Sequence, residues 1–180
     1  MDEDSDQRHN HIIFRRSTNG GRSWEQARVI VDFGEDFHAN NPVAVQVRDG
    51  NNQGRILLTV TRLTKSYSDD AQGFMGPDCG RHYITYSDND GVTWSPLREI
   101  TRLVRNENSR KVVAGPGSGI QVRWGDVQGR VVLPFTETKG AFVLWSEDGG
   151  DSWIRGESNG NGGEIEVAEL IPVSGKPRAC

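Results

Sequence analysis

One eight-residue pattern, Ser-x-Asp/Asn-x-Gly-x-Ser/Thr-Trp, occurs three times in this chain. The copies occupy residues 17–24, 87–94 and 146–153, and each follows a short run rich in apolar and β-branched residues. A Ser or Asx side chain can bind nearby backbone N–H groups, and glycine adopts the left-handed conformation of a tight turn. The closing tryptophan can fold back beneath the turn as an apolar plug. The pattern therefore predicts a tandem β-repeat of three equivalent hairpins, each with a largely buried tryptophan.

The spacing of the copies predicts the architecture. Ser17, Ser87 and Ser146 lie 70 and 59 residues apart, which suits propeller blades of four strands. Strands are expected at residues 43–47, 56–61, 82–86 and about 95–100 in the middle unit. The third unit repeats them at 119–122, 131–135, 142–145 and after Trp153. No helix of ten or more residues is expected, so the chain is predicted to be an all-β propeller.

The same count predicts that the propeller is incomplete. The first strand of the middle unit begins 44 residues before its motif serine, whereas only 16 residues precede Ser17. Residues 164–170 resemble the opening strand of a fourth unit, so about two and a half blades are expected. Six blades at this spacing would need on the order of 390 residues. We therefore expect residues 1–180 to be part of a propeller domain that is incomplete at both ends.

Composition narrows the classes of partner. The net charge is −4 and there is no basic run, which argues against a nucleic-acid partner. No stretch approaches 18 apolar residues, so no transmembrane segment is expected. His9 and His11 share one face of a strand without a third ligand at suitable spacing, and are expected to be exposed histidines rather than metal ligands. The sequence leaves the oligomeric state open, and the compartment open between cytoplasm and lysosome.

Four further segments resemble the exo-α-sialidase (neuraminidase) superfamily of six-bladed β-propellers, where the turn motif is called the Asp box. Asp6, ten residues before Arg16, resembles the acid-bearing loop that precedes the family's Arg-Arg-Ser strand. Residues 41–43, Asn-Pro-Val, resemble the segment that opens the second blade. Residues 114–121 resemble the Gly-Pro-Gly loop that opens the third, and residues 163–170 the Glu-x-Gln-Val-x-Glu-Leu strand that opens the fourth. The resemblance covers nearly the whole chain in the family's order.

The resemblance implies an enzyme that removes terminal α-linked sialic acid from glycoproteins, glycolipids and oligosaccharides. Sialic acid carries a carboxylate on its anomeric carbon, which would repel an anionic nucleophile, and sialidases use a tyrosine instead. By resemblance, Glu164 takes the proton of that tyrosine, and Asp6 is the acid/base for the leaving group and for water. Asn41 and the loop around Gly117 are expected to contact the sugar. The scheme uses neither cofactor nor metal.

The chain departs from the family's pattern at several places. The three arginines that grip the substrate carboxylate and the nucleophilic tyrosine are expected to lie outside residues 1–180, so the chain alone is predicted to be inactive. Glu166 stands where the family usually has glutamine. Phe135 and Thr136 follow Pro134, where animal sialidases often carry tyrosines.

Alternatives stay open at this stage. Non-catalytic propellers also carry the Asp box, so the alternative function is a glycan- or protein-binding module. Asp6 could also be an ordinary charged residue of the acidic N-terminal stretch, and Glu164 an ordinary exposed charged residue of its strand, without a catalytic role.

Overall fold

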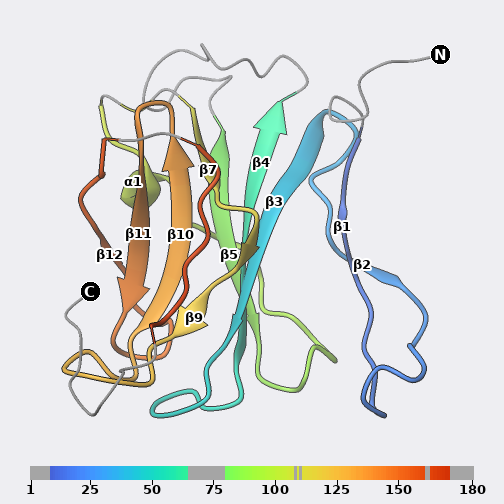
Figure 1. Cartoon of the computed structure of the whole chain (residues 1–180). Coiled ribbons are helices and arrows are strands. Elements are labelled where there is room, and N and C mark those ends of the chain that lie inside the picture. Colours follow the sequence, from blue (N-terminus) through green and yellow to red (C-terminus); the bar gives the residue numbers. More distant parts are fainter. Residues whose placement is uncertain (1–8, 65–79, 108, 110, 161–162, 171–180) are drawn as a thin grey trace.

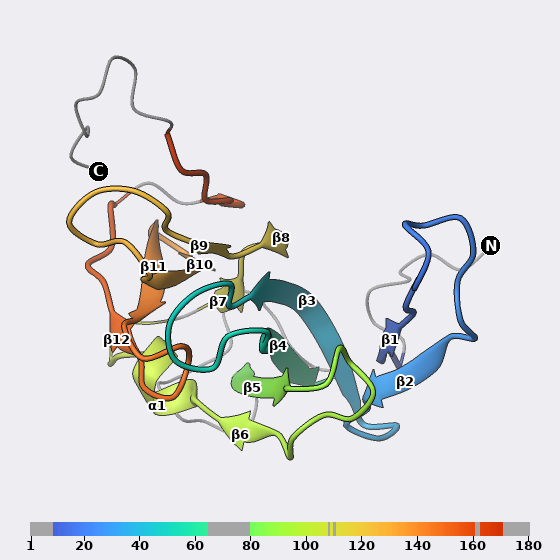
Figure 2. The same cartoon turned by 90° about the horizontal axis from the view of Figure 1, so that it is seen from below.

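The computed structural model describes residues 9–64, 80–107, 109, 111–160 and 163–170. These residues are nearly all-β, as predicted, and form three sheets that stand side by side (Figure 1). The only helix among them is the single turn α1 (Thr101–Val104). The sheets form an open arc in the view from below (Figure 2).

The second sheet is the most regular, with the strand order β6-β5-β4-β3-β8, in which β8 is Gly117–Ser118. Its antiparallel strands are β3 (Phe37–Gln46), β4 (Ile56–Thr64), β5 (Arg81–Ser87) and β6 (Arg98–Glu99). The first three strands predicted for the middle unit are confirmed, and β3 starts six residues earlier than predicted. The fourth is shorter than predicted, because Pro96 has no N–H to donate to a ladder.

The third sheet repeats the four antiparallel strands of the second as β12-β11-β10-β7, and β9 also pairs with β10. Its strands are β7 (Val112–Ala114), β9 (Ile120–Gln121), β10 (Val131–Glu137), β11 (Gly140–Ser146) and β12 (Ile154–Arg155). β7 and β9 pair with β10, whereas β8 crosses to pair in parallel with β3. The single inner strand predicted at 119–122 is wrong in extent, because two short strands, β7 and β9, pair with β10 in its place. They are separated at Pro116, which lacks an N–H donor, and at Gly117, which has φ 120°.

The first unit contributes a two-stranded ribbon beside β3. β1 (Ile12–Phe14) and β2 (Arg28–Val31) pair antiparallel, with an irregularity in register after Ile12. The Ala39 N–H donates to the carbonyl of Asn10 at 2.9 Å and links the ribbon to the second sheet.

Two apolar clusters fill the spaces between the sheets. The larger joins the second and third sheets and includes Leu57 and Leu133. The smaller joins the ribbon to the second sheet and includes Val31 and Leu58. Neighbouring residues of β4 thus point into different clusters, which explains why the strand is apolar on both faces rather than alternating.

The three turn motifs form the hydrogen bonds that the sequence predicts. In each copy the serine hydroxyl accepts the glycine N–H at 2.8 Å, and the Asx Oδ1 accepts the N–H of the following Ser or Thr at 2.8–2.9 Å. The motif glycines all have positive φ; they are Gly21, Gly91 and Gly150. The turns lie at the lower end of the sheets in Figure 1.

The motif tryptophans differ in burial. Trp153 is 9% exposed and donates its Nε1–H to the Gly150 carbonyl at 3.0 Å. Trp94 is half-buried, with its ring edge-on to Phe14. Trp24 is 57% exposed. The burial prediction is confirmed for Trp153 and wrong for Trp24, because no described sheet covers the far side of the ribbon.

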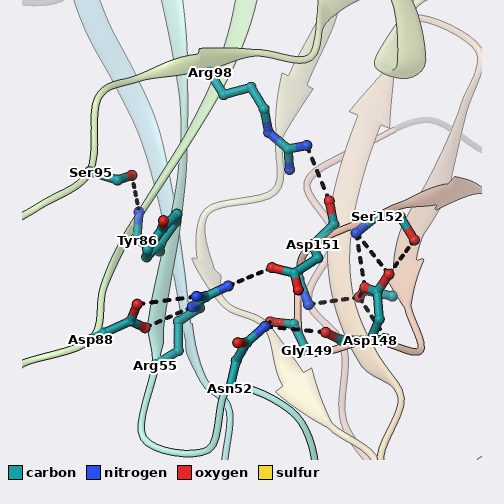
Figure 3. Close-up of polar contacts among 12 residues, drawn as sticks. Asn52, Arg55, Tyr86, Asp88, Ser95, Arg98, Asp148, Gly149, Asp151 and Ser152 are labelled. Atoms are coloured by element: carbon teal, nitrogen blue, oxygen red, sulfur yellow. Dashed lines mark hydrogen bonds and ion pairs between the residues drawn. The ribbon is translucent and has the colours of Figure 1, made fainter.

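A polar contact joins the turn ends of the second and third sheets (Figure 3). The Arg55 guanidinium lies over the Tyr86 ring and pairs with Asp88 of the second motif and Asp151 of the third. The Asp88 carboxylate raises the pKa of Arg55; burial opposes this effect and Asp151 adds to it. Gly149 lies against the neighbouring turn, where a Cβ would approach the Asn51 carbonyl oxygen to 2.2 Å. Glycine is therefore required there for the sheets to approach this closely.

Candidate functional site

Asn41 lies at an irregularity in β3. The pairing of β3 with β4 shifts register between Asn40 and Val43, and Asn41 has φ 52°. Its Nδ2 donates to the Ala114 carbonyl at 3.1 Å. Asn41 therefore ties the second sheet to the end of β7, directly before the Gly-Pro-Gly loop.

The glycines of that loop pack against residues 163–170. A Cβ on Gly115 would lie 2.2 Å from the Ile165 carbonyl oxygen. A Cβ on Gly117 would lie 3.1 Å from Glu166 Oε1, and Gly117 also has positive φ. A side chain at Gly115 would push the segment away, so the close approach depends on glycine.

Residues 163–170, called here the C-terminal segment, are extended but form no strand ladder with the described residues, so the predicted strand is not confirmed. Their exposure alternates as in a strand. Ile165, Val167 and Glu169 are half-buried by residue, while Glu164 and Glu166 are exposed. One side of the segment therefore faces the third sheet, and the other faces away from that sheet, with the Glu166 carboxylate near Gly117 of β8.

Glu164 lies on the outward side of the C-terminal segment. Its carboxylate forms no hydrogen bond or ion pair within the described ranges, and its backbone is held on both sides. Before it, the Thr136 hydroxyl donates to the Gly163 carbonyl. After it, Ile165 lies against Gly115. The carboxylate is thus free to meet another group, as its predicted role requires.

Glu169 has a structural role that the sequence does not predict. Its side chain is only 8% exposed, and Oε1 accepts the backbone N–H groups of Arg123 and Trp124, both at 2.8 Å. Oε2 lies 3.5 Å from Arg123 Nε. The resemblance of residues 167–170 to the family's Val-x-Glu-Leu pattern was the available signal, although a pattern match does not show which carboxylate is buried.

The fold brings three of the four candidate residues, which are far apart in the sequence, into one region of the structure. Asn41 contacts the start of the Gly-Pro-Gly loop, and that loop, with Gly117, contacts the segment that carries Glu164. The fourth, Asp6, lies outside the described residues. Whether these residues contact a sugar stays a prediction.

The histidines near β1 are exposed, as predicted. His9 Nε2 lies 2.8 Å from Asp32 Oδ1, and this hydrogen bond, together with the Gly34 N–H, lowers the pKa of Asp32. The described residues contain no cluster of three side chains arranged to hold a metal ion. None of their helices is long and apolar enough to cross a bilayer.

Comparison with known proteins gives consistent matches. The BNR repeat-like domain matches residues 3–179. The chain is 27% identical over 181 residues to a sialidase of Bacteroides fragilis (strain YCH46), covering 92% of this chain and 32% of that protein. It therefore spans about a third of the length of that curated relative.

Two solved structures show the same fold. Hadza microbial sialidase Hz136 superposes with a TM-score of 0.73 at 22% identity, covering 84% of this chain and 32% of the other. A leech intramolecular trans-sialidase complexed with 2,7-anhydro-Neu5Ac gives a TM-score of 0.74 at 14% identity, covering 86% and 40%. The three sheets are thus part of a β-propeller of the sialidase type, which confirms the predicted fold class.

Proposed function

Since this chain belongs to the BNR repeat-like domain family, within the exo-α-sialidase superfamily, we propose that it forms about two and a half blades of a six-bladed sialidase propeller. The complete protein then releases terminal α-linked sialic acid from glycoproteins, glycolipids and oligosaccharides. In this proposal, residues 1–180 form only part of the catalytic domain, which continues on both sides of them. The open arc of sheets and the partial coverage of the relatives support this proposal.

The observation that carries the proposal is the meeting of three blade-opening segments. The bulge at Asn41, the loop with Gly117 and the segment with Glu164 are far apart in the sequence but contact one another in series. These are the segments that resemble the sugar-binding and catalytic parts of the family. Their contacts support a shared site on geometry as well as on sequence.

In the proposed mechanism, a tyrosine from the remainder of the protein attacks the anomeric carbon while Glu164 takes its proton. Asp6 protonates the departing glycosidic oxygen, and the sugar becomes bonded to the tyrosine. Asp6 then removes a proton from water, which displaces the tyrosine and releases sialic acid; Glu164 returns the proton to the tyrosine oxygen. Asn41 and the backbone at Gly117 contact the sugar.

The test is an assay of the complete protein with a fluorogenic α-sialoside and with a sialylated oligosaccharide. We expect release of the fluorophore and of free sialic acid. Formation of 2,7-anhydro-Neu5Ac instead would show that the protein is an intramolecular trans-sialidase, like the leech enzyme to which the chain is similar. Binding of sialylated glycans without any turnover would contradict the enzyme proposal and favour the binding-module alternative.

A further inference from the structure

We infer that Glu169 is a positioning residue for Glu164, because it fixes the register of the C-terminal segment on the third sheet. The inference rests on the proposed function, which makes Glu164 the base. Glu169 itself contacts Arg123 and Trp124. It acts on the reaction only through the placement of Glu164.

The chemistry of the Glu169 contact is that of a strong anchor. One carboxylate oxygen accepts two consecutive backbone N–H groups at 2.8 Å, and the other faces the Arg123 guanidinium at 3.5 Å. The side chain is 8% exposed, whereas that of Arg123 is 59% exposed. An ionised carboxylate loses hydration on burial and needs such donors, and charge-assisted hydrogen bonds are stronger than neutral ones. The anchor therefore favours one placement of the segment over others.

The segment needs an anchor because no ladder holds it within the described residues. Nearer its start, it is held by the neutral Thr136–Gly163 hydrogen bond and by packing against Gly115 and Gly117. Glu169 supplies the charged contact at the opposite end from Gly163. Each end of the segment is thus tied to the third sheet.

Register is what connects Glu169 to Glu164. Alternate residues of an extended segment point to opposite sides, so Glu169 facing the sheet leaves Glu164 facing away. A slip by one residue would turn Glu164 toward the sheet and Ile165 outward. Holding Glu169 between the two amide groups excludes that slip, and so keeps the Glu164 carboxylate available to a nucleophile.

The experiment is a double-mutant cycle in the complete protein, with Glu169→Ala, Glu164→Gln and the double variant. Glu147→Gln is the matched control, since it breaks another Glu–Arg pair of the third sheet, with Arg130, away from the segment. We expect Glu169→Ala to lower kcat about tenfold or more with KM changed less than about threefold. In the Glu164→Gln background the same change should lower kcat less than about twofold, and Glu147→Gln should match the parent.

A second measurement tests the anchor directly. Amide hydrogen exchange at Arg123 and Trp124 should be faster in Glu169→Ala than in Glu147→Gln. Equal kcat losses in both backgrounds, unchanged kcat in Glu169→Ala, or unchanged exchange at these amides would each overturn the inference while leaving the proposed function intact. A parent protein without turnover would instead overturn the proposed function, and the inference with it.

Discussion

Arg55 Nη1 and Asp151 Oδ1 lie 2.7 Å apart, although the two residues are 96 positions apart. Arg55 directly precedes β4 of the second sheet, and Asp151 lies in the turn motif of the third. Arg55 also makes a two-pronged contact with Asp88 at 2.7 and 3.1 Å. Asp88 and Asp151 occupy variable positions of the second and third copies of the turn motif, and they share this one cation. Positions that vary between copies of the motif here connect neighbouring sheets.

We therefore expect Arg55→Met to lower the free energy of unfolding by about 2–3 kcal/mol, because it removes a mostly buried guanidinium together with its charged hydrogen bonds to Asp88 and Asp151. Asp151→Asn alone should cost less than about 1 kcal/mol, since Asp151 is exposed and Asp88 keeps its contact. Urea denaturation of the complete protein measures both. If Asp151→Asn costs as much in the Arg55→Met background as in the parent, the two side chains are not coupled.

The burial of the motif tryptophans gives a matched pair of variants. In the 180-residue chain, Trp153→Ala should lower the free energy of unfolding by about 3–5 kcal/mol, as for other large buried aromatic side chains. Trp24→Ala should change it by less than about 0.5 kcal/mol, because Trp24 is exposed. Thermal unfolding followed by circular dichroism compares the two. Equal, small effects of both variants in the 180-residue chain would contradict the packing described for Trp153.

In the complete propeller we expect a further blade to cover Trp24, so there Trp24→Ala should lower the free energy of unfolding more than it does in the 180-residue chain.

Asp148 predicts a dependence of stability on pH. Burial opposes its ionisation, but the Ser152 hydroxyl and N–H and the Ser146 hydroxyl donate to it and lower its pKa to about 2. Since the folded pKa lies below the ordinary value of 3.8, the stabilisation is complete above that value and is lost as the pH falls toward 2. Asp148→Asn should remove this part of the acid dependence.

The first two motifs provide the control for that variant, since they carry Asn19 and Asn89 at the same position. Their Oδ1 atoms accept the N–H of the following Ser or Thr as Asp148 does, and their Nδ2 atoms donate to its hydroxyl, where in the third motif the hydroxyl donates to Asp148. We expect Asp148→Asn to fold at neutral pH for this reason. Urea titrations at about pH 7, 4 and 2.5 measure the difference. If the free energy of unfolding of Asp148→Asn falls with decreasing pH as steeply as that of the parent, other carboxylates cause the acid dependence.

For catalysis, Glu164→Gln in the complete protein should fold normally and lower turnover by roughly 10²–10⁴, the usual contribution of a positioned base. Glutamine keeps the shape of the side chain but cannot take the tyrosine proton. Glu166→Gln is the matched variant, because Glu166 is exposed on the same side of the segment. Should Glu166→Gln lose turnover while Glu164→Gln keeps it, the assignment of the base to Glu164 is wrong.

The purified 180-residue chain should show no turnover of a fluorogenic sialoside above buffer. The arginines and the tyrosine nucleophile of the proposed mechanism are expected to lie outside it, and loss of either removes transition-state stabilisation worth several powers of ten. The assay needs protein free of host sialidase. Turnover by the chain alone would contradict both the incomplete-domain proposal and the site assignment.

The repeating parts of this structure were more predictable from the sequence than the irregular ones. The turn motifs were predictable because their hydrogen bonds lie within eight residues and recur three times. The crossing of β8 to β3 was not, because it depends on a contact between Gly117 and Val43 that no local pattern records. The exposure of Trp24 likewise depends on which sheet lies beside it, and its motif is the same as that of Trp153.

The candidate site shows the same division. Resemblance identified Asn41, Gly117 and Glu164 as candidates, and the structure brings their segments into contact. The importance of Glu169 could not be read from the sequence, since three glutamates lie along one segment and only burial distinguishes them. Gly115 was part of the recognised loop, but its contact with Ile165 depends on tertiary structure.

The parallel pairing of Gly117–Ser118 with Val43–Ala44 has a consequence for how the chain folds. Because the third unit supplies a strand to the second, the second sheet reaches its full width only after residues more than 70 positions downstream have been synthesised. Such non-local closure slows folding and makes neighbouring units unfold together. The two larger sheets should therefore behave as one cooperative unit, whereas the β1–β2 ribbon, which exchanges no strand with them within the described ranges, can open first.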